Sequence, residues 1–426
     1  HCLLRRQRQM CIRDRSMDMD QAQSCSIPHH TTPPACQMEW RGGWAETHGP
    51  QKHHIHQVVW AHLQNSNEPN LHLLSPRSLI IANLVFSRGK SQHANELSVA
   101  IHKPSFVHQM NAELPKLNVA VVGATGMVGR TMLAVLEARN FPIERLLPVA
   151  SSRSVGSHVK FRGKDVTVMS IEDALAQNPH VALFSAGGDL STAWAPQFSA
   201  SGITVVDNSS AWRMSEEHKL VVPEVNGGEL TPMDLVVANP NCTTIQLVMC
   251  LKPLHDRWRI TRGVVNTYQS VTGTGQAAVA QMEAERRGEK GQGVYPHSID
   301  QNCLPHCDAF QENGYTREEM KVHQETKKIM GDSSVQLSCT AVRVPVMGGH
   351  SEAVYLELAE DFELEDVRES LNAFPGVVVE DEPSQAVYPM PLKAQGRDEV
   401  FVGRLRRDLA NPRGLHLWIV ADNLRK

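Results

Sequence analysis

The sequence contains no apolar run long enough to cross a membrane, and none near its start that could serve as a signal peptide. The longest early apolar stretch, residues 78–86, is too short for the first role and too far from residue 1 for the second. An excess of basic charge is also missing, since the net charge is −4, so nucleic acid is not an expected partner. Nine cysteines, an odd number, argue against a disulfide framework and for a reducing compartment. We therefore expect a cytoplasmic protein that binds neither nucleic acid nor a membrane.

Residues 1–110 lack the apolar periodicity of the rest of the chain. This stretch holds 12 of the 21 histidines and four of the nine cysteines, yet no Cys/His spacing in it matches a zinc module. We expect a disordered or artefactual extension without a metal site, with Met110 as the true start. The whole chain of 426 residues is long enough for two or three domains.

The regular part of the chain begins with a pattern that is typical of a dinucleotide site. Leu117–Val122 is a short apolar strand, the sequence GATGMVG follows at residues 123–129, and an apolar helix comes next. The glycines Gly123, Gly126 and Gly129 permit a tight turn and a close approach of the backbone to a pyrophosphate at the helix start. The spacing GxxGxxG is only moderately specific, so an ordinary tight turn between a strand and a helix is the alternative.

The end of the next strand, Leu146–Ala150, bears on the choice of nucleotide. Sites for NAD usually carry an acidic residue there, which binds the ribose 2′-hydroxyl. Here Ser151, Ser152 and Arg153 follow the strand, and hydroxyls with an arginine suit a 2′-phosphate, so we predict NADP. Further strands are expected to end at the same crevice, at Val181–Phe184, Thr204–Asp207 and Leu235–Ala238.

A cysteine follows the last of these strands in a position that suits a nucleophile. After the turn Asn239–Asn241, Cys242 stands where an apolar helix, Thr243–Asp256, begins. The partial positive charge and the unpaired N–H groups of a helix start stabilise a thiolate, which is the reactive form. The alternative is a buried core cysteine, and position alone favours neither.

The second half of the chain carries further candidates. Val264–Tyr268 is an expected strand, and Thr316–Glu319 is a capping box that opens a helix through Met330. Glu318 and Lys321 lie one turn apart on that helix, a spacing that by itself favours a surface ion pair.

Two polar residues lie on or next to the following strands. The strand expected at Val335–Val346 carries Arg343, and His350 follows two glycines at the start of the next strand. A lone histidine is usually structural, but this one is also a candidate base for a distant cysteine. Cys303 and Cys307 could suggest a metal, but no second ligand pair lies nearby, so we expect a loop there.

Short motifs in a fixed order carry a resemblance to a known family. They are GATGMVG, SSRS, NSSAWRM, NPNCTT, YQSVTGTG, EEMKVHQETKKI and VRVPVMGGHSE. Together they resemble the bacterial type of aspartate-semialdehyde dehydrogenase, over residues 117–426. The resemblance implies an α/β fold similar to glyceraldehyde-3-phosphate dehydrogenase, with a Rossmann-type NADP-binding domain at residues 117–241 and 405–426 and an α+β catalytic and dimerisation domain at residues 242–404. The family pattern continues past Lys426 into a helix that packs on the nucleotide domain.

The resemblance also implies a role for each candidate residue. Catalysis would depend on Cys242 as the nucleophile and His350 as the acid/base. The substrate would be bound by Gln269, Glu318 and Arg343, and phosphate by Arg213, Asn241 and Lys321. The nucleotide would contact Gly123, Thr125, Gly126, Met127, Val128, Gly129, Ser151, Ser152, Arg153, Thr272, Gly273 and Asn423.

The reaction of this family is the reversible, NADP-dependent conversion of L-4-aspartyl phosphate to L-aspartate 4-semialdehyde and inorganic phosphate. It passes through a cysteine thioester, in the biosynthesis of lysine, threonine, methionine and diaminopimelate, and the members are homodimers or homotetramers. Two alternatives stay open. A sister enzyme such as N-acetyl-glutamyl-phosphate reductase shares the acyl-thioenzyme chemistry, although its nucleophile motif differs from NPNCTT. A nucleotide-binding protein without catalysis is disfavoured by the joint presence of Cys242, Gln269, Arg343 and His350.

Overall fold

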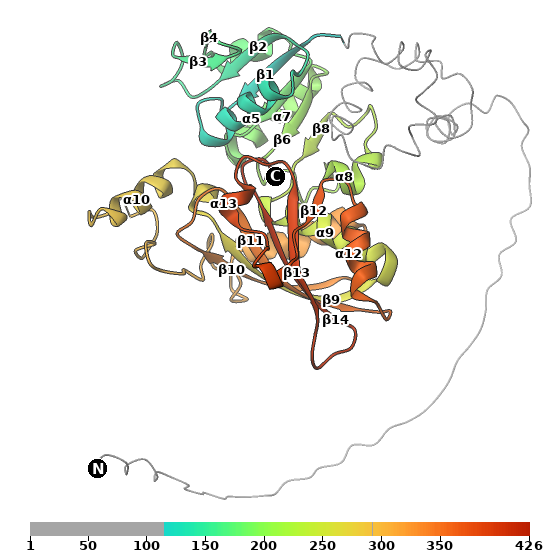
Figure 1. Ribbon diagram of the computed structural model, residues 1–426. Coiled ribbons are helices and arrows are strands. Elements are labelled where there is room, and N and C mark those ends of the chain that lie inside the picture. Colours follow the sequence, from blue (N-terminus) through green and yellow to red (C-terminus); the bar gives the residue numbers. More distant parts are fainter. Residues whose placement is uncertain (1–114, 292) are drawn as a thin grey trace, which may run out of the picture. The chain divides into compact units, whose positions relative to one another are not determined.

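The computed structural model describes residues 115–291 and 293–426. The extension expected at residues 1–110 lies outside the described residues. Two six-stranded sheets and a two-stranded hairpin organise the described part of the chain (Figure 1). None of the helices in these ranges is long and apolar enough to cross a membrane.

The first sheet is parallel throughout, in the order β2-β1-β5-β6-β8-β7. Side chains alternate between the faces of a strand, and in β1 Val119 and Val121 join one apolar cluster while Ala120 and Val122 join another. Helix α5 packs on the first cluster, and α6 and α7 pack on the second, so both faces are covered. The elements are β1 (Leu117–Val122), α5 (Met127–Ala138), β2 (Ile143–Val149), β3 (His158–Phe161), β4 (Lys164–Thr167), α6 (Ile171–Ala176), β5 (Val181–Phe184), α7 (Gly188–Ala200), β6 (Thr204–Asp207), β7 (Lys219–Leu220) and β8 (Val236–Ala238).

The second sheet is mixed, in the order β10-β9-β11-β14-β13-β12. Its outer pairs, β10 with β9 and β13 with β12, are parallel, and the pairs between them are antiparallel. The strands are β9 (Ile260–Gln269), β10 (Gln336–Arg343), β11 (His350–Leu358), β12 (Val377–Val379), β13 (Val400–Arg407) and β14 (Gly414–Ala421). The remaining helices are α8 (Pro223–Asn226), α9 (Cys242–Trp258), α10 (Gln276–Arg286), α11 (Arg317–Met330), α12 (Leu364–Ala373) and α13 (Pro391–Ala394).

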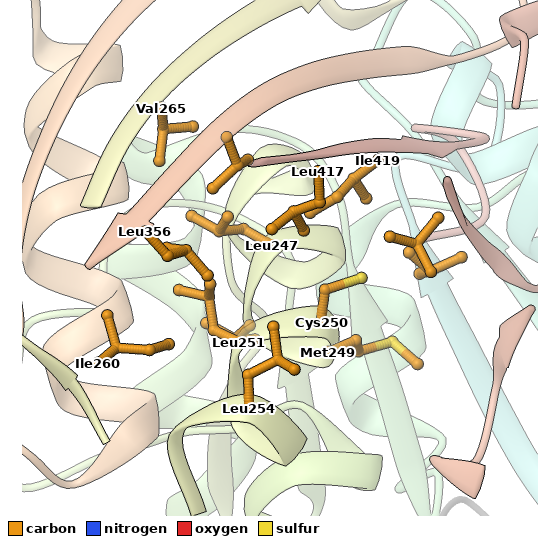
Figure 2. Packing of buried hydrophobic residues seen from close by; sticks show 14 of the residues in the cluster. Leu247, Met249, Cys250, Leu251, Leu254, Ile260, Val265, Leu356, Leu417 and Ile419 are labelled. Carbon is orange, nitrogen blue, oxygen red and sulfur yellow. The ribbon is translucent and has the colours of Figure 1, made fainter. Parts of the chain in front are cut away.

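Helix α9 lies within an extensive apolar cluster (Figure 2). Its buried side chains include Leu247, Met249, Cys250, Leu251 and Leu254. They pack with strands of the second sheet through Val265 in β9, Leu356 in β11, and Leu417 and Ile419 in β14. Because burial of apolar surface stabilises the whole length of α9, this packing determines where the first residue of the helix lies.

The predicted fold class, a Rossmann-type domain followed by an α+β domain, is confirmed. The predicted boundary at residue 404 is wrong, because β13 crosses it and β14 lies inside the second sheet between β11 and β13. The physical reason is the alternation of apolar side chains in β14, where Leu415, Leu417 and Ile419 join the cluster around α9. Helix α5 begins earlier than the sequence indicated, at Met127, inside the glycine motif.

Candidate active site

Cys242 is the first residue of α9, close after the end of strand β8. Asn241 caps the helix, since its side-chain oxygen accepts a hydrogen bond from the N–H of Thr243 at 3.0 Å. Cys242 is partly exposed, whereas Asn241 and Thr243 are buried. The predicted position at a helix start is confirmed, and the core cysteine of this helix is Cys250 instead.

The protonation of the Cys242 thiol differs from what a helix start alone predicts. Burial raises its pKa to about 12, and the carboxylate of Glu318 acts in the same direction. Arg213, Arg343 and the N–H of Thr243 lower the pKa, but by less. The helix start thus acts in the predicted direction, but burial outweighs it, and the thiol keeps its proton at neutral pH. A base has to remove the proton.

The Glu318 carboxylate is buried beside the turn that carries Cys242. One oxygen accepts hydrogen bonds from Nδ2 of Asn241 at 3.0 Å and from Nε2 of Gln269 at 3.2 Å. The other oxygen pairs with Nζ of Lys321 at 3.0 Å. Burial raises the pKa of Glu318, but Lys321 and Asn241 outweigh it, so the pKa is lowered and the group is ionised. A surface ion pair, which the spacing alone favoured, is therefore the wrong interpretation.

Gln269, Arg343 and His350 meet at one end of the second sheet. The parallel strands β9 and β10 pair Gln269 with Arg343 at the last position of both. Strand β11 runs antiparallel to β9 and begins at His350, so its first residue lies at the same end. All three residues are buried. The sheet thus brings together residues that are far apart in the sequence.

Hydrogen bonds to Ser270 orient Arg343 and His350. Nη1 of Arg343 donates to the Ser270 carbonyl oxygen at 2.8 Å, and the N–H of Ser270 donates to Nδ1 of His350 at 3.0 Å. Because Nδ1 accepts, the proton of the neutral ring is on Nε2. Burial, and then Arg343, hold the pKa of His350 well below its usual value, so the ring is neutral at pH 7.

Three buried N–H groups of predicted site residues have no partner among the described residues: Nε of Arg213, Nε of Arg343 and Nε2 of His350. A buried donor without an acceptor costs about 1–3 kcal/mol, so such groups call for a ligand or a water. Gly273 borders the same space, because a Cβ there would lie 3.0 Å from Nη1 of Arg343 and 3.0 Å from Nε2 of His350. The arrangement suits a ligand with several acceptor oxygens.

Arg213 reaches the nucleophile turn from the first domain. Its Nη1 pairs with Glu325 at 3.1 Å, and its Nη2 donates to the Asn208 carbonyl oxygen at 3.0 Å. The other oxygen of Glu325 accepts the N–H of Asn241 at 2.7 Å. Glu325 was not identified from the sequence, although it lies about two turns after Glu318 on the same face of α11, and that spacing could have indicated it.

The glycine turn between β1 and α5 is built as predicted. Gly123 has a φ of +90°, and a Cβ there would lie 2.3 Å from the Ser185 carbonyl oxygen. A Cβ at Gly129 would lie 2.1 Å from the carbonyl oxygen of Gly123, so neither position tolerates a side chain. Gly126 caps α5 without a side-chain hydrogen bond, which leaves the N–H groups of the helix start for an anion. The residues of this turn that are at least partly exposed are Gly123, Thr125, Gly126, Met127 and Val128.

The turn after β2 lies beside the glycine turn. The carbonyl oxygen of Val149, the last residue of β2, accepts hydrogen bonds from the N–H groups of Gly123 at 2.9 Å and Ala124 at 3.0 Å. Residues 151–153 (SSR) follow shortly after and are exposed. This place suits a contact with the ribose of a nucleotide.

A short 3-10 helix, η3 (Val271–Thr274), lies close to the glycine turn at the start of α5. Met127, the first residue of α5, packs against the apolar cluster that includes η3. Oγ1 of Thr272 donates to Oδ1 of Asn423 at 2.9 Å, and both residues are buried. Thr272, Gly273 and Asn423 therefore lie near one another, as expected for one binding region.

The described residues between α10 and α11 form no helix or strand. Cys303 is exposed and Cys307 is buried, and His306 stacks on Phe310 with ring centroids 4.4 Å apart. Within residues 115–291 and 293–426, no group of metal-ligating side chains is present. The expectation of a loop is confirmed for this segment.

Comparisons with known proteins identify the class that this fold and site define. The family model "Semialdehyde dehydrogenase, NAD binding domain" matches residues 118–232, and "Semialdehyde dehydrogenase, dimerisation domain" matches residues 251–426. The chain thus combines the two domains of a semialdehyde dehydrogenase. The second match supports a homo-oligomer.

Individual relatives narrow this class. The chain is 48% identical to aspartate-semialdehyde dehydrogenase of Aquifex aeolicus (strain VF5), over 72% of this chain and 93% of the relative. It is 51% identical to that of Legionella pneumophila, over 73% of this chain and 92% of the relative. A crystal structure of aspartate semialdehyde dehydrogenase II from Vibrio cholerae, complexed with ASA, matches with a TM-score of 0.70 and 42% identity, over 73% of this chain and 94% of that chain.

The chain belongs to the aspartate-semialdehyde dehydrogenase family. It is an oxidoreductase of amino-acid biosynthesis, as the ordered motifs predicted. The comparisons support neither a sister acyl-phosphate reductase nor a protein without catalysis.

Proposed function

We propose that the protein catalyses the reversible, NADP-dependent reductive dephosphorylation of L-4-aspartyl phosphate to L-aspartate 4-semialdehyde and inorganic phosphate. The observation that carries this proposal is the set of buried, unpartnered N–H groups on Arg213, Arg343 and His350. A substrate with a carboxylate at one end and an acyl phosphate or aldehyde at the other offers acceptor oxygens to each of them. The Vibrio cholerae relative was solved in complex with ASA, which supports aspartate semialdehyde as the ligand.

Arg343, Glu318 and Gln269 are assigned to the amino-acid end of the substrate. The Arg343 guanidinium is anchored through Nη1 on Ser270, and its Nε remains for the substrate carboxylate. The ionised Glu318 supplies a counter-charge for the substrate ammonium group. Gln269 is oriented by its hydrogen bond to Glu318.

Arg213, Asn241 and Lys321 are assigned to the phosphate. Nε of Arg213 has no partner among the described residues, and Asn241 directly precedes Cys242. Nζ of Lys321 lies 3.0 Å from Glu318 and 2.9 Å from Asp308, so its positive charge is held close to the same turn. Cationic groups of this kind stabilise a phosphoryl group through charge-assisted hydrogen bonds.

Cys242 forms the covalent intermediate. Its sulfur attacks the aldehyde carbon and the thiol proton moves to the substrate oxygen, which gives a thiohemiacetal. Because burial raises the thiol pKa to about 12, the thiol proton has to be moved, and we assign this transfer to His350. Its Nε2–H donates a proton to the substrate oxygen, and Nε2 then takes up the thiol proton. General acid–base catalysis typically contributes about 10²–10⁴-fold. Loss of a hydride and a proton leaves the thioester, and attack by phosphate releases the sulfur and forms the acyl phosphate.

Residues of the first domain would hold NADP. The glycine turn fits a pyrophosphate, because no Cβ fills it and the start of α5 has no side-chain cap. Residues 151–153 offer two hydroxyls and a guanidinium to a 2′-phosphate, where an NAD site would carry an acid. A nicotinamide nucleotide bound there supplies or accepts the hydride.

A phosphate-dependence assay tests the proposal. The full chain is mixed with L-aspartate 4-semialdehyde and NADP⁺, and formation of NADPH is followed with and without inorganic phosphate. We expect turnover that requires phosphate and that prefers NADP⁺ to NAD⁺. The N-acetyl-glutamate semialdehyde serves as the control substrate. Turnover without phosphate, or faster turnover of the N-acetylated substrate, contradicts the proposal.

A further inference from the structure

Helix α11 directs a second buried carboxylate, Glu325, at the turn that carries the nucleophile. The Glu325 side chain is 1% exposed. One oxygen accepts the backbone N–H of Asn241 at 2.7 Å, and the other pairs with Nη1 of Arg213 at 3.1 Å. One side chain thus contacts both the residue before Cys242 and the guanidinium assigned to phosphate.

The placement of Arg213 does not depend on Glu325 alone. Nη2 of Arg213 donates to the Asn208 carbonyl oxygen at 3.0 Å, so the guanidinium has a second anchor. Its buried Nε has no partner among the described residues, and it remains for a ligand oxygen. A carboxylate that shares the anchoring of Arg213 with Asn208, and that offsets its charge in a buried site, affects what else the guanidinium can bind.

The charge of Arg213 also acts on the nucleophile. Arg213 and Arg343 lower the pKa of the Cys242 thiol, against burial and Glu318, which raise it. Burial raises the pKa of Glu325 above its ordinary value, and Arg213 and the Asn241 N–H, which stabilise the carboxylate, offset that rise only in part. A Glu325 carboxylate that pairs with Arg213 at 3.1 Å weakens the effect of Arg213 on any anion nearby, whether thiolate or phosphate.

We propose that Glu325 is a positioning residue that anchors the nucleophile turn through Asn241 and moderates the charge of Arg213, so that phosphate is bound weakly enough to leave. The phosphate half of this inference rests on the proposed function of Arg213. A guanidinium without a counter-charge would hold the phosphate product more tightly and slow its release, and it would stabilise the Cys242 thiolate more strongly. A purely structural carboxylate predicts neither effect.

The first test is the Glu325→Gln variant, which keeps the shape and an acceptor oxygen for the Asn241 N–H. We expect the KM for inorganic phosphate to fall about threefold or more, since Arg213 loses its counter-charge while Asn208 still holds it. The matched control is Glu319→Gln, which removes another buried carboxylate of α11 that bonds Thr316 and Ala341 and does not contact Arg213. An unchanged or higher KM in Glu325→Gln, or the same fall in Glu319→Gln, overturns the inference.

A second test needs no phosphate. The rate of alkylation of Cys242 by iodoacetamide at pH 8, read by mass spectrometry on the Cys242 peptide, follows the thiolate fraction. We expect about threefold faster alkylation in Glu325→Gln, which corresponds to a thiol pKa lower by about half a unit, and slower alkylation in Arg213→Gln. The double variant, which removes both charges, should alkylate at a rate close to that of the wild type. If Glu325→Gln alone does not fold, the other two variants still test the charge balance. Arg213→Gln should be alkylated more slowly than the wild type, and the double variant should recover the wild-type rate.

The outcomes separate this inference from the proposed function. If Arg213→Gln leaves the KM for phosphate unchanged, the assignment of Arg213 fails, and the phosphate half of the inference fails with it. If Arg213→Gln raises that KM but alkylation does not respond to Glu325→Gln, the inference alone is overturned. If Glu325→Gln and Arg213→Gln both slow the alkylation of Cys242, Glu325 has a structural role, and the inference is overturned as well.

Discussion

The Cys242 thiol lies where a helix start, two guanidinium groups and a carboxylate all act on it, and burial raises its pKa to about 12. His350 is neutral, because burial and Arg343 lower its pKa, and its Nδ1 accepts the Ser270 N–H. A protonated thiol and a neutral imidazole form a site that is unreactive until a proton is moved. Under the proposed function, an anionic substrate bound at Arg213 and Arg343 would change the charges around both groups.

Replacement of the nucleophile tests the residue on which the chemistry depends. We expect Cys242→Ala to lower kcat by at least about 10⁴-fold, because no thioester can form. NADP affinity should stay within about twofold, since the glycine turn and residues 151–153 lie on the first domain. Steady-state kinetics and nucleotide titration measure the two effects. The control is Cys303→Ala, an exposed cysteine, which should keep wild-type kcat; a Cys242→Ala enzyme within tenfold of wild type would remove the thiol from the mechanism.

Replacement of Arg343 tests whether the orientation of the substrate can be lost while nucleotide binding is kept. Arg343→Lys keeps the charge but loses the planar guanidinium, one arm of which donates to Ser270 at 2.8 Å. We expect KM for the semialdehyde to rise and kcat to fall, with kcat/KM lower by about tenfold or more, because a tilted substrate misses the attack geometry. The KM for NADP should hardly change. Arg406→Lys, at an exposed arginine, is the control, and normal semialdehyde kinetics in Arg343→Lys would exclude Arg343 from the site.

Two turns of the first domain form the proposed nucleotide site: the turn between β1 and α5, and the turn after β2. The first excludes side chains, because a Cβ at Gly129 would lie 2.1 Å from the carbonyl oxygen of Gly123. The second is held next to it by the hydrogen bonds to Val149. Under the proposed function, the glycines would shape a site for any dinucleotide, and residues 151–153 would discriminate between nucleotides.

Arg153 is the side chain expected to read the 2′-phosphate. Arg153→Ala should raise KM for NADP by about tenfold and change KM for NAD by less than about twofold, because only NADP carries the phosphate. Initial-rate kinetics with each nucleotide varied in turn give both constants. Arg162→Ala, which removes an exposed arginine of the same domain, should leave both unchanged. Equal losses for NADP and NAD in Arg153→Ala would show that this side chain does not read the phosphate.

At the scale of the whole molecule, Asp398 connects segments from both ends of the described chain. Its carboxylate pairs with Arg139, which follows α5, at 2.9 Å and with Arg425, which follows β14, at 2.7 Å. Burial opposes ionisation, but Arg425 and Arg139 outweigh it and lower the pKa of Asp398 from 3.8 to about 2. The folded state therefore favours the carboxylate more strongly than the unfolded chain does.

The stability contributed by Asp398 is expected to depend on pH in a defined direction. Since the folded pKa is depressed, the contribution is fully present above the unfolded value of 3.8 and is lost as the pH falls toward 2. Asp398 is about one-third exposed, so we expect about 1 kcal/mol or less for each pair, and a thermal midpoint of Asp398→Asn lower by about 2 °C at pH 7. The difference should shrink in scans below pH 4. Asp361→Asn, at a far more exposed ion pair, should match wild type, and a constant deficit at every pH would contradict the ionic origin.

The arrangement of elements was predictable where it depends on short segments. Strands such as Val181–Phe184 and Thr204–Asp207 appear with the bounds that the sequence indicated. The domain boundary at residue 404 was not predictable, because β13 and β14 resemble any alternating strands, and only their pairing with β11 shows to which sheet they belong.

The sequence by itself determined the fold class, the family and the place of the candidate nucleophile. These depend on local chemistry: glycines at a tight turn, a cap at Asn241 and a helix that begins at Cys242. Only the tertiary structure decided how the site is charged, that is, the burial of Glu318, the contacts of Glu325 and the protonated state of the thiol. The reason is that desolvation and Coulomb interactions act through space, and the groups responsible come from helix α11 and the ends of three strands that the chain brings together only on folding.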